Sequence, residues 1–163
     1  MSIKDEQEAA KQDAHYEAAR YLRNAEDTLK KAGQDGKWFL DKKYVSTACG
    51  TAYLGVLLAM DAIFSLRGVK PPRGNKRESI KYYVENAAKI DGRLARDLNY
   101  AYQILHIDGY YEGVLKIPTI RDGFDTAYGI IERICPERKL TDEEYKARRR
   151  SGSRVGRLAA WLF

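Results

Sequence analysis

The sequence predicts an all-α protein folded as an up-and-down antiparallel bundle of long helices. Only four prolines occur in 163 residues, and two of them are adjacent at Pro71 and Pro72, so long stretches are free to be helical. Apolar residues recur at steps of three and four, and no stretch shows the alternation of a half-buried strand. A chain of this length is expected to form one domain with one substantial core.

The first helix is expected over 4–32. Its apolar stripe recurs at steps of four and three, at Ala18, Leu22, Ala25, Leu29 and Ala32. The glycine-rich segment 33–36 ends the helix. We expect Trp38 and Phe39, which follow, to pack as a plug over the end of the bundle rather than to form a ligand platform.

The second helix is expected to start near Asp41, a suitable N-cap, and to end at Gly68. It is apolar on nearly every side, which predicts a position in the middle of the bundle. Small residues that allow close helix approach are spread along it: Ala48, Gly50, Ala52, Gly55 and Ala59. Asp61 is the exception, and we expect it to form an ion pair or a capping contact with a neighbouring helix.

Further helices are expected over 77–89, after the break at residues 90–92, and from Ile117 to Pro136. The middle one carries an apolar stripe and is expected to end between Gly109 and Gly113. A last helix is expected over 142–163. The chain therefore divides into a helical bundle domain, residues 1–136, and a basic C-terminal helical extension, residues 137–163.

The net charge of +6 is distributed unevenly. Residues 1–145 hold 23 basic and 23 acidic side chains, which cancel. Residues 146–163 hold six basic side chains and no acidic one. The whole excess of positive charge therefore lies in the last 18 residues.

This basic C-terminus has three interpretations. Its arginines could neutralise the phosphates of a nucleic acid. Its apolar end, at Trp161, Leu162 and Phe163, could instead lie at an anionic membrane surface. It could also pack on the bundle or on a second subunit, which we favour because the rest of the chain is electrically neutral. The candidate nucleic-acid-binding residues are Arg148, Arg149, Arg150, Arg154 and Arg157.

Composition argues against several classes of protein. Cys49 and Cys135 lie on apolar stretches without CxxC spacing, so we expect no metal site, no disulfide, no cofactor and a cytoplasmic location. The polar and acidic residues 1–13 are not expected to form a signal peptide. The longest apolar run, residues 52–64, is too short for a transmembrane segment.

Most catalytic signatures are absent from the sequence, and only two histidines occur. His15 is expected at the surface of the first helix. Helical spacing places His106 on one face with Asn99, Tyr110 and either Tyr102 or Gln103. That face could line a groove or could be a helix flank that hydrogen-bonds to adjacent helices, and the flank is favoured.

Two segments, YVSTACGTAYLGVLLAMDAIFSLRG over 44–68 and LNYAYQILHIDGYYEG over 98–113, carry a family resemblance. With the helices around them they resemble the HEPN superfamily (higher eukaryotes and prokaryotes nucleotide-binding domains), and more narrowly an uncharacterised bacterial branch of it. The resemblance covers roughly residues 18–134. It implies a four-helix core with an extra C-terminal helix, and a homodimer.

Ribonucleases of that superfamily carry an arginine followed, after four to six residues, by a histidine. If His106 is that histidine, the arginine should lie at 99–101, where the chain has Asn99, Tyr100 and Ala101. Arg96 lies ten residues upstream, which rotates it about 80° from His106 and places it about 15 Å along an ideal helix. The departure from the motif argues against nuclease activity.

The leading hypothesis is a non-catalytic binding or regulatory module for nucleic acid or a nucleotide. One alternative is a metal-independent, toxin-type ribonuclease with His106 as acid–base and Tyr110 or Asn99 as auxiliary residues. The other is a structural protein-interaction bundle. A partner protein encoded by a neighbouring gene would favour a toxin–antitoxin role.

Overall fold

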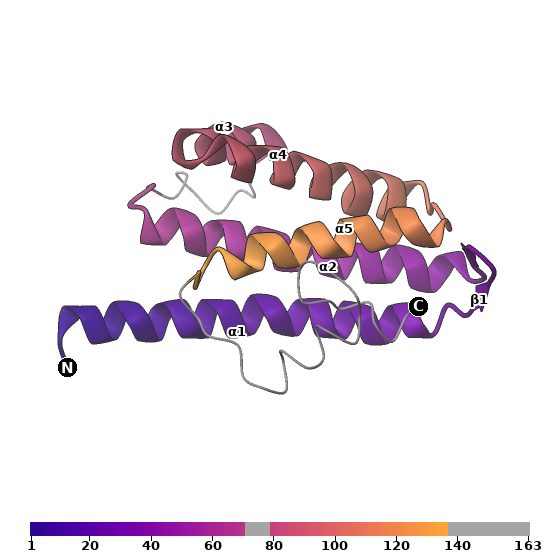
Figure 1. Ribbon diagram of the computed structural model, residues 1–163, viewed down its shortest axis with the longest axis horizontal. Helices are drawn as coiled ribbons and strands as arrows, with labels where there is room; N and C mark the ends of the chain where they lie inside the picture. The colour runs from indigo at the N-terminus through magenta and orange to yellow at the C-terminus, as the bar shows by residue number, and fades with distance from the viewer. Residues whose placement is uncertain (71–78, 137–163) are drawn as a thin grey trace.

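The computed structural model describes residues 1–70 and 79–136, and it confirms the all-α prediction. Its helices are α1 (Ile3–Lys30), α2 (Lys42–Leu66), α3 (Ile80–Ile90), α4 (Gly92–Ala101), η1 (Tyr102–Tyr111) and α5 (Ile117–Glu132). Figure 1 shows α1, α2 and the α4–η1 segment running antiparallel in turn, with α5 returning in front of α2. The helix expected over 142–163 lies outside the described residues.

The first helix begins with a reciprocal cap. The Asp5 backbone N–H donates to Ser2 Oγ at 3.2 Å, and the Ser2 backbone N–H donates to the Asp5 carboxylate at 2.9 Å. The apolar stripe expected on this helix is buried, with Ala18, Leu22 and Ala25 fully inaccessible. That stripe packs along α2. Helices α1 and α2 form the most extensive contact between two helices of the described residues.

A short hairpin joins α1 to α2, and the sequence did not predict it. Strand β1 (Gln34–Asp35) pairs antiparallel with β2 (Trp38–Phe39), and Gly36 turns the chain at a φ of 56°. Phe39 is 2% exposed and plugs the end of the bundle as expected. The prediction was wrong for Trp38, which is 56% exposed, because successive strand residues point to opposite faces.

The N-cap predicted for α2 is confirmed, since Asp41 accepts a hydrogen bond from the Lys43 backbone N–H at 3.0 Å. Helices α1, η1 and α5 pack around α2, and 56% of its most apolar stretch is buried. By length and composition alone, α2 is the one helix among residues 1–70 and 79–136 that could cross a membrane. Its burial against α1, η1 and α5 explains why much of α2 is apolar.

The expected burial of α2 on nearly every side is confirmed only in part. Leu58 is 39% exposed and Leu54 is half-buried. Asp61 contacts a neighbouring helix through a hydrogen bond that the Tyr83 hydroxyl of α3 donates at 2.9 Å. This bond is neither of the two predicted contacts, an ion pair or a cap, and Asp61 itself is exposed. Burial, and secondarily this carboxylate, raise the pKa of Tyr83.

The break expected at residues 90–92 is confirmed. Asp91 has extended backbone angles, ends α3 and caps α4 by accepting from the Arg93 N–H at 3.0 Å. The following helix then changes from α to π geometry at Tyr102. Gly109 consequently lies inside the helix, and only Gly113, at a φ of 64°, lies beyond its end.

The last described helix, α5, begins at Ile117 with Pro118 in its first turn, as predicted. Its buried face contacts α4, α2, η1 and α1. Gly123 lies where a β-carbon would come within 2.6 Å of Ile104 and 2.9 Å of Leu105. The glycine therefore sets how closely α5 approaches η1.

Candidate functional site

His106 lies at the centre of an aromatic group on the η1 side of α2. Its ring centroid is 4.7 Å from that of Tyr53, 5.3 Å from Tyr102, 5.9 Å from Tyr110 and 5.0 Å from Tyr111. The Tyr110 ring is nearly parallel to the imidazole, at 16°, whereas the Tyr111 ring is perpendicular to it, at 84°. We call these five residues the His106 cluster.

The π-helical geometry of η1 brings four of these rings together. A π-helix bonds residues five apart, so positions four and five residues apart become neighbours on its surface. Tyr102, Tyr110 and Tyr111 stand at those separations from His106. The same spacing appears in the hydrogen bond from Gln103 Nε2 to Asp108 at 2.9 Å.

Two glycines let these rings lie close to α2. A β-carbon at Gly50 would come within 3.0 Å of the Tyr110 ring. A β-carbon at Gly109 would overlap the Cys49 sulfur and lie 2.7 Å from the Cys49 Cβ. Burial raises the pKa of that thiol to about 12, so Cys49 is a packing residue and no nucleophile.

The His106 cluster runs from the core to the solvent. Tyr53 is 7% exposed, Tyr102 and His106 are half-buried, and Tyr110 and Tyr111 are 46% and 64% exposed. The inner rings are therefore held by packing, while the outer rings keep accessible faces and hydroxyl groups. Such an arrangement can stack a planar ring and hydrogen-bond to its edge.

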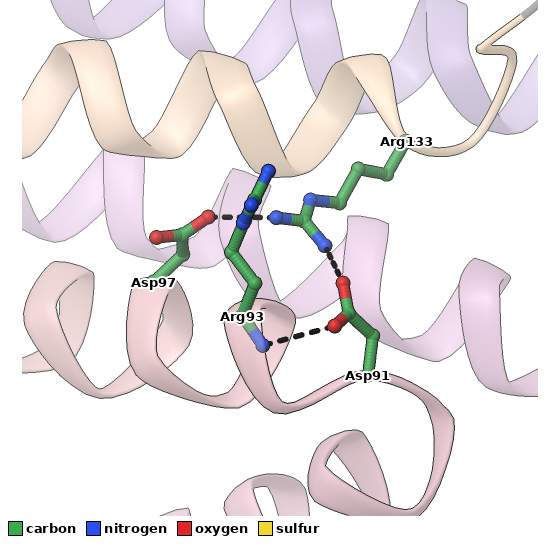
Figure 2. Close-up of polar contacts among 4 residues, drawn as sticks. All are labelled: Asp91, Arg93, Asp97 and Arg133. Atoms are coloured by element: carbon green, nitrogen blue, oxygen red, sulfur yellow. Dashed lines mark hydrogen bonds and ion pairs between the residues drawn. The ribbon is translucent and has the colours of Figure 1, made fainter.

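A second polar group joins the end of α5 to the corner between α3 and α4. Arg133 donates from Nη1 to Asp91 at 2.7 Å and from Nη2 to Asp97 at 2.9 Å (Figure 2). The Arg93 backbone N–H, followed by the Arg133 side chain, lowers the pKa of Asp91. We call Asp91, Asp97 and Arg133 the Arg133 corner.

A third polar contact ties α5 to α1. The Tyr128 hydroxyl donates to the Glu26 carboxylate at 3.1 Å, and Glu26 is only 6% exposed. Burial, followed by the charge of Glu26, raises the pKa of Tyr128. The contact gives the buried Glu26 carboxylate a hydrogen-bond donor and stabilises the packing of α5 on α1.

A family model described as a domain of unknown function (DUF5618) matches residues 13–136. The chain belongs to this family. A solved protein of unknown function from Dyadobacter fermentans is 34% identical, with a TM-score of 0.67, and the match covers 76% of this chain and 94% of that one. No curated protein matches the chain. Membership in this family fits the expected uncharacterised branch, and the HEPN resemblance stays a prediction.

The structure brings together two of the three predicted catalytic residues, His106 and Tyr110. Asn99 is exposed on α4, and its side chain makes no hydrogen bond with any residue of the described ranges. On an ideal α-helix, positions seven apart share a face. The change to π geometry at Tyr102 reduces the rotation per residue, so the face expected from α-helical spacing does not continue to His106.

Sequence reasoning missed two members of the His106 cluster, Tyr53 and Tyr111. Tyr53 carries the aromatic ring nearest to the imidazole, but it lies on α2, 53 positions earlier in the chain. Tyr111 is five residues from His106, a spacing that α-helical periodicity does not pair. The sequence signal that could have indicated Tyr111 is the pair of consecutive tyrosines, Tyr110 and Tyr111, between the two glycines where the helix was expected to end.

The remaining site predictions concern metals and the basic tail. Within residues 1–70 and 79–136, no group of three His, Cys, Asp or Glu side chains is placed to hold a metal ion. Both cysteines are buried, and neither forms a disulfide with a residue of the described ranges. All five tail arginines predicted to bind nucleic acid lie outside the described residues: Arg148, Arg149, Arg150, Arg154 and Arg157.

Proposed function

We propose that this chain is a non-catalytic binding module that holds a nucleobase of a nucleotide or of RNA on the His106 cluster. The observation that carries the proposal is the contact of one imidazole with four tyrosine rings, two of which are largely exposed. A binding surface of this kind needs no activated nucleophile.

Stacking on aromatic rings is a general way to hold bases. Each stacked base contributes about 1–3 kcal/mol, and any base can take part because each has a flat π-face. The rings of Tyr110 and Tyr111 meet at 68°, so the two present differently oriented surfaces. A base on one ring can meet the edge or hydroxyl of the other, which favours an aromatic nucleobase over an aliphatic ligand.

The surroundings of His106 support binding rather than cleavage. RNA cleavage at a histidine requires a positive group that stabilises the developing charge on the phosphate. Four tyrosine rings contact His106, and Asn99, at a position where the motif would place the arginine, carries no charge. The toxin-type ribonuclease therefore remains the alternative. Cleavage of RNA by the purified chain, abolished in His106→Ala, would establish it and overturn the proposal.

Matched pairs of tyrosines test the binding site. Tyr110 and Tyr111, 46% and 64% exposed, have counterparts in Tyr100 and Tyr16, 47% and 60% exposed on other helices. We expect Tyr110→Leu with Tyr111→Leu to weaken binding of a fluorescent single-stranded RNA by about tenfold or more. Fluorescence anisotropy measures the affinity.

The control is Tyr16→Leu with Tyr100→Leu in the same full-length chain. Equal affinity of the wild type and both double variants would show that the His106 cluster does not hold the base. Circular dichroism melting of each variant separates a binding defect from unfolding. Competition by adenosine and uridine monophosphates tests whether a single nucleotide is sufficient.

The other expectations extend this proposal. We propose that the tail arginines add sequence-independent affinity, and Arg→Gln at all five positions should then lower both RNA affinity and its salt dependence. The HEPN-like relationship, the homodimer, the partner from a neighbouring gene and the cytoplasmic location stay predictions. Analytical ultracentrifugation of the full chain tests the homodimer.

A further inference from the structure

We infer that the hairpin end of the bundle, at Lys37, Trp38, Lys42 and Lys116, extends the His106 cluster as a surface for single-stranded nucleic acid. The ligand would then be a strand of several nucleotides rather than a mononucleotide. This inference rests on the proposed function, because the outer tyrosines supply the first stacking position.

Backbone contacts hold the hairpin against the segment that follows η1. The Phe39 N–H donates to the Leu115 carbonyl at 2.8 Å, and the Ile117 N–H donates to the Lys37 carbonyl at 2.9 Å. Between them, Trp38 forms a β-bridge with Lys116. Trp38 and Lys116, from distant parts of the chain, are thus fixed opposite each other, and Lys37 directly precedes Trp38.

A second contact connects this end to the His106 cluster. Gly113, two residues beyond Tyr111, adopts a φ of 64°. A β-carbon there would overlap the side chain of Lys42, whose Cγ and Cδ would lie 2.7 Å from it. The Lys42 side chain therefore packs against Gly113, two residues beyond the exposed Tyr111.

The local charge at this end is positive, although residues 1–145 are neutral as a whole. Residues 30–43 and 112–116 together hold six lysines and three acidic residues, a difference of three. Lys37, Lys42 and Lys116 are exposed and form no ion pair with any residue that the structure describes. Their ammonium groups can neutralise successive phosphates.

Exposed rings lie among these lysines. Trp38 is 56% exposed beside Lys116, and Tyr111 is 64% exposed two residues before the Lys42–Gly113 contact. Alternating cations and stacking rings are characteristic of surfaces that bind single strands without sequence preference. The hairpin also exposes Leu40, at 63%, so a lipid surface is the competing ligand. We favour a nucleic acid because lysines lie among the exposed rings.

The test uses the full-length chain and a short fluorescent single-stranded RNA at increasing salt. Each phosphate contact to a single strand contributes about 0.7 to the slope of log K against log salt. We expect Lys37→Gln, Lys42→Gln and Lys116→Gln together to reduce the magnitude of that slope by about 2. The matched control changes Lys4, Lys81 and Lys89, which are exposed elsewhere, to Gln.

Trp38→Leu should weaken the RNA complex by about tenfold, since one stacking position is lost. Binding of adenosine monophosphate should be unchanged in both Trp38→Leu and the lysine variant, and lost with Tyr110→Leu and Tyr111→Leu. That pattern supports both proposals. Loss of RNA binding only in the tyrosine variant retains the proposed function and overturns the extended surface.

Three other results contradict the inference. An unchanged salt slope in the lysine variant excludes these phosphate contacts. An equal change in the control variant shows that only net charge matters. Unchanged RNA binding, together with loss of binding to vesicles containing phosphatidylserine, would identify the surface as a membrane contact. If no variant changes the binding of RNA or of the mononucleotide, both proposals fail.

Discussion

The Arg133 corner and the His106 cluster both join segments that lie far apart in the sequence, but they do so with different chemistry. At the corner, two carboxylates and one guanidinium satisfy one another through two short ion pairs. In the cluster, rings pack face and edge, and the outer rings remain exposed. The charged groups of the corner bind one another, whereas the outer rings of the cluster remain accessible to a ligand.

The two regions also differ in packing. Gly109 meets Cys49 across the helix contact of the cluster, while a β-carbon at Gly92, in the corner, would meet nothing within 4 Å. The helices at the corner are thus joined by ion pairs, with free space at Gly92. At the cluster, the helices η1 and α2 pack closely against each other. Substitutions should affect stability most in the cluster's buried part and least at its exposed rings.

The largest effect is expected from Gly109→Ala. The added methyl group overlaps the buried Cys49 side chain, so the variant should lose about 1–3 kcal/mol of unfolding free energy. Gly92→Ala is the matched control and should be neutral or slightly stabilising, because alanine favours a helix where space is open. Urea denaturation measures both. Equal stability of the two variants would contradict the close contact.

A smaller effect is expected from Arg133→Gln. The variant loses two ion pairs in a side chain that is 27% exposed, so it should cost about 1 kcal/mol. RNA binding should be unchanged, because the corner lies outside the proposed surface. Asp97→Asn and the double variant complete a thermodynamic cycle. Additive losses in that cycle would show that the Arg133–Asp97 pair contributes nothing.

The corner should also make stability depend on pH. Folding lowers the pKa of Asp91 below its usual value of 3.8, so the stabilisation is complete above that value and is lost as pH falls through the folded-state pKa. Asp91→Asn retains the cap but removes the charge. The wild type should therefore melt higher than this variant at pH 6, with a smaller difference at pH 3.

Arg133 supplies the second cause of that pKa shift, after the Arg93 N–H. In an Arg133→Gln background the pH dependence of the Asp91→Asn difference should shrink but persist. Thermal melts followed by circular dichroism at both pH values provide the comparison. A difference that is constant between pH 6 and pH 3 would show that the charge of Asp91 does not contribute.

The smallest stability effect is expected at the exposed rings. Tyr110→Leu with Tyr111→Leu should change the unfolding free energy by less than about 1 kcal/mol, because both side chains are exposed and leucine retains part of the apolar contact. The same variant should have the largest effect on RNA binding. A large loss of stability would instead assign these rings to the core and weaken the case for a ligand surface.

The helices themselves were predictable because their signals are local. The stripe through Leu22 and Leu29, the caps at Asp41 and Asp91, and Pro118 in the first turn of α5 each act within a few residues. A contact of Asp61 with another helix was also predicted, but on the premise that its charge is buried, and Asp61 is exposed. Its partner, Tyr83, could not be named in advance.

The candidate site was predicted only in part. His106 and Tyr110 share a face, as α-helical spacing suggested, but Asn99 does not join them. The reason is the π geometry from Tyr102 onward, which α-helical periodicity cannot represent. Trp38 was likewise expected inside, because two residues are too few to show a strand's alternation.

The sequence by itself determined an all-α bundle, the position of its breaks and the stripes that face the core, because hydrophobic periodicity and capping are short-range properties. Only the tertiary structure decided which rings surround His106 and which carboxylates Arg133 binds. These contacts join residues such as Tyr53 with His106 and Asp91 with Arg133, and they depend on how closely the helices approach. That approach is set by the fit of glycines such as Gly109 against a neighbouring helix, a property of the packed helices together.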